Sequence, residues 1–220
     1  MAPVLPALAL LASAAPAQAK IVELGKTADA AGTPTCPASP CLAVSRTTGY
    51  QVKVGAKRGV FTVPSDGRIV AWEISLGNPN TKQIAFFDKG YGEASAGITV
   101  LRQGKRLFSR VLGQSPIEKL APYFGQTVQF PLDRSIPVVK GNMIGLTVPT
   151  WAPALSTLTS DGSSWRASRG KDACDDTDTQ TAQTRMRQLT QYRCLYRARM
   201  TYGATLVTNP KPNPKPKPKK

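Results

Sequence analysis

Apolar and polar residues alternate through most of this chain with the two-residue period that is typical of β-strands. The clearest example is Arg68–Leu76, RIVAWEISL, in which Trp72 falls on one apolar face together with Val70, Ile74 and Leu76. We therefore expect a half-buried strand here, with the Trp72 ring in the core.

Residues Ile136–Val148, IPVVKGNMIGLTV, contain two short apolar runs on either side of Gly141-Asn142. Such a break between β-branched runs predicts a tight hairpin, which we expect to lie in the core. A second hairpin is expected where Gln103-Gly104-Lys105 joins Ile98–Arg102 to Arg106–Leu112.

Further strands are expected at regular intervals along the chain. They are Tyr50–Val54, Val60–Val63, Gln83–Asp88, Thr127–Leu132 and a long closing strand over Tyr192–Val207. Only Ser115–Tyr123 and Thr179–Gln191 are candidates for short helices. Short strands separated by Gly and Pro predict an all-β, antiparallel β-sandwich in a single domain, with a jelly roll as the most plausible topology.

The first 19 residues have the layout of a secretory signal peptide, with an apolar run over Leu5–Ala15 and an Ala-Gln-Ala cleavage pattern ending at Ala19. No later segment approaches the ~20 apolar residues that a membrane-spanning helix needs. We therefore expect no transmembrane segment in the mature form. The expected order is signal peptide (1–19), N-terminal arm with a short disulfide loop (20–49), sandwich domain (50–208) and Lys/Pro-rich tail (209–220).

Four cysteines in an exported chain indicate two disulfides. Three pairings are possible, and we expect the local one, Cys36 with Cys41 and Cys174 with Cys194, because short closures cost the least chain entropy. The chain has no histidine and no CxxC spacing, so we expect no metal site and no cofactor.

The chain is strongly basic, with 29 Lys and Arg against 13 Asp and Glu and a formal net charge of +16. The tail NPKPNPKPKPKK should form an extended, disordered polyproline II segment, and a polyanion suits its dispersed charges better than a single pocket does. A solvated linker is the alternative interpretation. The candidate polyanion-binding residues are Lys211, Lys215, Lys217, Lys219 and Lys220.

Candidate residues for other chemistry are few. Ring stacking on a glycan is possible for aromatic residues in loop-like surroundings, namely Trp151, Trp165, Tyr91 and Tyr123. The acidic run around Asp176 is expected to form ion pairs with the arginines that follow it rather than to bind calcium. Glu73 has no second carboxylate at a spacing that suggests glycoside hydrolysis.

Several short motifs occur in order: GRIVAW (67–72), ITVLR (98–102), Phe130-Pro131 and IPVVKGNMIGL (136–146). In these the chain resembles a group of exported β-sandwich proteins of unknown function from high-GC actinobacteria, except that Asn142 stands where the group often has Asp. The resemblance covers about residues 59–148 and the last strand. It implies the fold and export, and it implies no catalytic residue.

We therefore expect a secreted or cell-wall-associated, non-catalytic protein that binds anionic envelope polymers or acidic glycans. The absence of histidine removes the commonest general base and argues against an enzyme. A carbohydrate-binding module or glycan-active enzyme is the first alternative, and extracellular nucleic-acid binding is the second. The sequence does not predict the oligomeric state.

Overall fold

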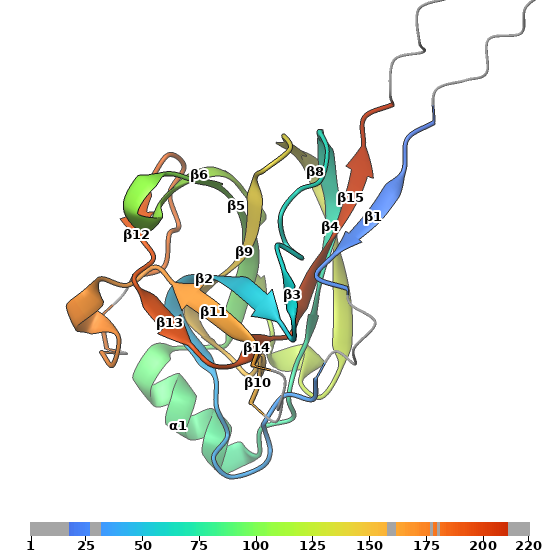
Figure 1. The fold of residues 1–220 in the computed structure, drawn as a ribbon. Coiled ribbons are helices and arrows are strands. Elements are labelled where there is room, and N and C mark those ends of the chain that lie inside the picture. The colour runs from blue at the N-terminus through green and yellow to red at the C-terminus, as the bar shows by residue number, and fades with distance from the viewer. Residues whose placement is uncertain (1–17, 27–31, 158–161, 177, 180, 211–220) are drawn as a thin grey trace, which may run out of the picture.

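Two antiparallel sheets pack together in the computed structural model of the chain, which describes residues 18–26, 32–157, 162–176, 178–179 and 181–210 (Figure 1). The elements are β1 (Ile21–Leu24), β2 (Val44–Val54), β3 (Lys57–Arg58), β4 (Gly67–Ser75), α1 (Thr81–Tyr91), β5 (Ser95–Gln103), η1 (Lys105–Leu107), β6 (Phe108–Gln114), β7 (Glu118–Lys119), η2 (Ala121–Tyr123), β8 (Thr127–Val138), β9 (Met143–Ala152), β10 (Leu155–Ser156), β11 (Ser164–Ala167), η3 (Lys171–Ala173), β12 (Leu189–Gln191), β13 (Cys194–Tyr196), β14 (Arg199–Met200) and β15 (Tyr202–Thr208). The expected all-β sandwich in a single domain is confirmed.

The smaller sheet has the strand order β1-β15-β4-β8. The larger sheet runs β12-β6-β5-β9-β2-β11-β13, with β3 on β2 and β7 on β5, and β10 pairs separately with β14. Because β1 pairs with β15, the segment expected to be an irregular N-terminal arm contributes a strand to the smaller sheet.

Apolar faces of both sheets form the core. Trp72 is fully buried as expected, and its ring stacks on Phe130 with centroids 4.7 Å apart. A register shift around Val70 turns β4, so that Ile69 is buried together with Trp72 and Ile74 while Val70 is half-buried. A bulge of this kind moves the following residues to the other face, which simple alternation does not anticipate.

The turn at Gly141-Asn142 is present, but the hairpin predicted around it is wrong. Strand β8 pairs with β4 and strand β9 pairs with β5 and β2, so the turn connects the two sheets. The Val63 N–H donates to the Asn142 carbonyl oxygen at 2.8 Å, and the Asn142 side chain accepts from the Val139 N–H at 2.9 Å. The second predicted hairpin, β5 with β6, is confirmed.

The prediction of one continuous closing strand over Tyr192–Val207 is also wrong. Residues 194–208 form three short strands: β13 pairs with β11, β14 pairs with β10, and β15 pairs with β4 and β1. The apolar alternation survives these breaks, because Met200, Tyr202, Ala204 and Leu206 are all buried.

The segment expected to be a strand at Gln83–Asp88 is helix α1. Asn80 caps it: its side chain accepts from the Gln83 N–H at 3.0 Å, and the Gln83 side chain accepts from the Asn80 N–H at 2.9 Å. This reciprocal capping box stabilises a helix start. The two segments expected to be helices are instead mostly non-helical: residues 115–123 form β7 and the single turn η2, and residues 181–191 form an irregular segment that ends in β12.

Both disulfides are confirmed: Cys36 pairs with Cys41 and Cys174 pairs with Cys194. The second bridge ties the start of β13 to the turn after η3. No helix in the described part of the chain has the length and apolar character needed to cross a membrane.

Candidate polyanion-binding surface

Strands β5, β6 and β12 lie side by side at one edge of the larger sheet (Figure 1). Lysine and arginine residues of these strands and of the adjoining loops concentrate positive charge there. The strand register places Arg102 of β5 directly opposite Arg110 of β6, and Arg110 directly opposite Leu189 of β12. Directly opposite residues in antiparallel strands point to the same face. Two guanidinium groups therefore lie together on this face.

The turn between β5 and β6 adds two further cations, Lys105 and Arg106, which are both exposed. Arg106 has φ 54° and Leu107 has φ 64°, and the Phe108 N–H donates to the Lys105 carbonyl oxygen. Two consecutive left-handed residues closed by this hydrogen bond form a type I′ turn, which usually contains Asn and Gly. The turn thus has Arg106 at a position where Asn or Gly would cause less backbone strain.

A loop before β12 carries Arg185 and Arg187, which are exposed beside the same strands. The Arg110 guanidinium donates to the Arg187 carbonyl oxygen at 3.1 Å, and the Arg187 N–H donates to the Val111 carbonyl oxygen at 3.1 Å. We define the cationic edge as Arg102, Lys105, Arg106, Arg110, Arg185 and Arg187.

Gln183 holds this loop on the sheet. It is fully buried, and its side-chain NH₂ group donates to the Gln188 carbonyl oxygen at 3.1 Å while the Tyr192 hydroxyl donates to its Oε1. Its backbone N–H donates to Thr48 Oγ1 at 2.9 Å. These bonds satisfy a buried amide and so position Arg185 and Arg187.

Burial raises the pKa of Tyr192 well above its ordinary value, with smaller contributions in the same direction from Tyr50 and Tyr202. The pKa of Tyr50 is also raised by burial, against opposing effects of the Arg166 charge and a hydrogen bond with Gln103. The phenols beneath the edge are therefore neutral at ordinary pH, and they add no negative charge to it.

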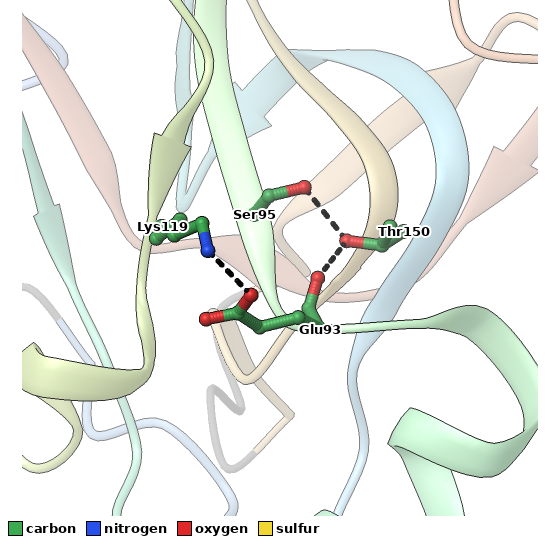
Figure 2. A network of polar contacts seen from close by, with 4 residues as sticks. All are labelled: Glu93, Ser95, Lys119 and Thr150. Carbon is green, nitrogen blue, oxygen red and sulfur yellow. Dashed lines mark hydrogen bonds and ion pairs between the residues drawn. The ribbon is translucent and has the colours of Figure 1, made fainter.

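No aspartate or glutamate occurs in residues 94–117 or 179–220, the segments that supply the cationic edge. In the described part of the chain, none of the six cations lies within 4.0 Å of a carboxylate oxygen. An ion pair is present at the other end of β5, where Lys119 Nζ lies 2.9 Å from Glu93 Oε2 (Figure 2). The seven residue-to-residue steps from Ser95 to Arg102 separate that end from the edge by roughly 23 Å.

Apolar side chains are interleaved with these charges. Phe108, Met186 and Leu189 are 37%, 56% and 51% exposed. Exposed apolar residues next to guanidinium groups lower the local dielectric constant and strengthen contacts to an anion.

The expectation that Trp151 and Trp165 lie in open loops is wrong. Trp151 is in β9 and fully buried, stacks on Phe87 at 4.6 Å, and donates from Nε1 to Asp88 Oδ1 at 2.8 Å. Trp165 is in β11 and 4% exposed. Neither ring presents an open face for stacking on a sugar, because both fill space between packed elements.

Tyr91 and Tyr123 are half-buried and pack on neighbouring side chains. The Arg46 guanidinium carbon lies 5.0 Å from the centroid of the Tyr91 ring, and Tyr123 meets Phe130 edge to face at 5.4 Å. A role for these two rings in glycan binding stays a prediction.

The five candidate lysines of the tail, from Lys211 to Lys220, lie outside the described residues. Ion pairing was expected between the acidic run and five following arginines, and four of them, Arg185, Arg187, Arg193 and Arg197, lie beyond ion-pair distance of every described carboxylate. For Arg199 the pairing stays a prediction. A hydrogen bond from the Thr179 hydroxyl is the main cause of a lowered pKa at Asp176, and backbone N–H groups of Asp178 and Thr179 add to it.

Glu73 lies directly opposite Gly203 and Gln129 on the smaller sheet. Glu23 lies opposite Thr205, whose hydroxyl donates to Glu23 Oε2 at 3.0 Å. Gly203 and Thr205 lie on the same face of β15, so their partners Glu73 and Glu23 lie on one face of the smaller sheet. The sequence alone did not indicate that Glu23 is near Glu73. In the described part of the chain, no three Asp, Glu, Cys or His side chains gather as metal ligands would.

The chain matches no protein-family model, no curated protein sequence and no solved structure. The resemblance to exported actinobacterial sandwich proteins therefore stays a prediction.

Proposed function

We propose that the protein is an exported, non-catalytic domain that binds anionic envelope polymers through the cationic edge, with the Lys/Pro tail as a second attachment. The observation that carries the proposal is the face shared by Arg102 and Arg110, which has no carboxylate within 4.0 Å among the described residues. Like charges in such a register repel, and a bound polyanion offsets that repulsion.

The chemistry of the edge favours polymers with carboxylate, sulfate or phosphate groups. Five of its six cations are arginines, whose planar guanidinium binds such groups in a bidentate manner. The two disulfides agree with export, because such bonds persist in oxidising compartments.

The test is co-sedimentation with purified cell-wall material across a salt series, using residues 20–220 and 20–208. A triple variant, R102Q/R106Q/R110Q, removes three charges from the edge. The matched control K57Q/R58Q/K82Q removes three exposed charges from β3 and α1, and so has the same net charge.

We expect the edge variant to pellet less than the control at every salt concentration, and the difference to shrink as salt screens the contacts. Equal pelleting of the two variants would mean that total charge, not the edge, determines binding. Competition with double-stranded DNA separates wall binding from nucleic-acid binding. If soluble DNA displaces the protein from the wall material at a lower phosphate concentration than soluble wall polymer does, nucleic-acid binding is favoured.

A further inference from the structure

A pocket of about 410 Å³ opens beside the Cys174–Cys194 disulfide, between the start of β2, β10 and the pair β11–β13. Its apolar wall is formed by Leu42, Val44, Leu155 and Ala198. The polar wall contains Trp165, Arg169 and Tyr196. The volume is within the range of sites that bind small molecules.

Arg169 is unusual among the residues that line this pocket, because its charged side chain is buried. Its side chain is 4% exposed, and no carboxylate oxygen of the described residues lies within 4.0 Å of it. One terminal nitrogen donates to the Tyr196 hydroxyl at 3.0 Å and the other to the Ser45 carbonyl oxygen at 2.5 Å. Its Nε has no acceptor. Asp176 lies close enough for the Arg169 charge to lower its pKa, but no carboxylate of the described residues lies at ion-pair distance. Burial of this guanidinium is therefore unfavourable, and an anion bound beside it would offset the cost.

Trp165 supplies a second donor without a partner, because its Nε1 is buried and has no acceptor. The half-buried Tyr196 contacts both residues: its ring centroid lies 4.7 Å from that of Trp165 and 5.9 Å from the Arg169 guanidinium carbon. Both orphan nitrogens are shielded from solvent, so the side chains around them have to move for an acceptor to reach them.

We propose that this pocket binds a small carboxylate ligand with an apolar body. The carboxylate oxygens provide the acceptors that Arg169 and Trp165 lack, and the body lies against Leu42, Val44 and Leu155. The site is distinct from the cationic edge, because none of the six cations of that edge lines the pocket. Asp175 and Arg197 also line the pocket. Asp175 opposes the binding of an anion, and Arg197 favours it.

The chain has three tryptophans, so its indole N–H groups give at most three resonances in a ¹H–¹⁵N correlation spectrum. The probes are hexanoate, acetate and hexanol, each added to the full mature chain up to about 10 mM, which saturates a site of millimolar Kd. W165F assigns the resonance of Trp165. We expect hexanoate to shift that resonance saturably and to leave those of Trp72 and Trp151 in place.

Each probe tests one part of the proposal. Acetate lacks four CH₂ groups, each worth about fourfold in affinity when buried, and should bind far more weakly. Hexanol lacks the charge and should bind about tenfold more weakly than hexanoate. Absence of a saturable shift with hexanoate, or equal binding of hexanol, would overturn the proposal.

Two variants test the charges. R169M replaces the guanidinium by an apolar chain of similar length and should reduce hexanoate affinity at least about tenfold, whereas R193Q, at an exposed arginine outside the pocket lining, should not. D175N keeps the pocket shape and should tighten hexanoate binding about threefold without affecting hexanol. If R169M does not fold, D175N decides: unchanged or weaker hexanoate binding would count against the site.

Discussion

Arg102 and Arg110 lie directly opposite each other on neighbouring strands, with no carboxylate of the described residues close enough to form an ion pair with either. This arrangement lowers the stability of the free protein, because like charges in direct register repel. It also gives the edge its affinity for anions, so the same two residues should affect stability and binding in opposite directions.

Replacing one member of this pair should stabilise the fold. For R102Q we expect the free energy of unfolding to rise by roughly 0.2–1 kcal/mol at low salt and the gain to disappear at high salt. Urea denaturation at two salt concentrations measures this change in the free energy of unfolding. K57Q, at an exposed cation on β3, is the control and should show a smaller gain; an equal gain would assign the effect to net charge alone.

The type I′ turn should also store strain. R106N/L107G places the residues preferred in this turn at the two positions with positive φ, and we expect a gain of about 1 kcal/mol in unfolding free energy. The variant should bind polyanions less tightly, since it loses one cation. K105Q loses a neighbouring cation without relieving a positive φ, and should weaken binding with little change in stability. A loss of stability in R106N/L107G would contradict this account.

Replacing Gln183, which holds the loop before β12 on the larger sheet, should be strongly destabilising. For Q183L we expect a loss of about 2–4 kcal/mol, because the buried Tyr192 hydroxyl loses its acceptor and the Ser109 and Gln188 carbonyl groups lose the Gln183 amide as a donor. Chemical denaturation measures the loss. Q129L is the control, since Gln129 is exposed and makes a single long hydrogen bond of 3.4 Å to Thr205. Similar losses in both variants would show that the network contributes little.

Stability should fall steeply at alkaline pH. Burial raises the pKa of Tyr50, Tyr192 and Tyr202 in the folded state. In the unfolded chain these phenols ionise near pH ~10, so above that pH the unfolded state binds fewer protons and is favoured. Below pH ~10 both states keep these protons, and the three residues cause no pH dependence there.

An alkaline titration monitored by phenolate absorbance and circular dichroism checks this prediction. Of the six tyrosines, we expect the three buried ones to ionise only together with loss of the fold. In strong denaturant all six should titrate near pH ~10. Ionisation of all six in the folded protein would contradict the assignment.

The strands with regular alternation were predictable from sequence, and so was the β5–β6 turn, because period and turn residues are local properties. Helix α1 was missed because its apolar residues, Ile84 to Phe87, form a short cluster that fits either structure. The capping pair Asn80 and Gln83 was the available signal for a helix.

Strand partners were not predictable, because alternation does not determine which strand lies next to which. The turn at Gly141-Asn142 therefore has the local sequence of a hairpin turn although it joins two sheets. The cationic edge depends on the same information: Arg102, Arg110 and Arg187 come together only through the register of β5, β6 and β12. The absence of acidic residues from 94–117 and 179–220 was the signal that pointed to it.

Strands β1 and β15 run antiparallel, and Lys20 and Thr208 meet at their outer end through two hydrogen bonds of 2.8 and 2.9 Å (Figure 1). The chain therefore enters and leaves the domain at one point. A force that pulls the two chain ends apart acts on the β1–β15 pair from one end. The hydrogen bonds between the two strands therefore break one after another instead of all at once. Under tension β1 should peel away first and at low force, while the sandwich behind it stays folded.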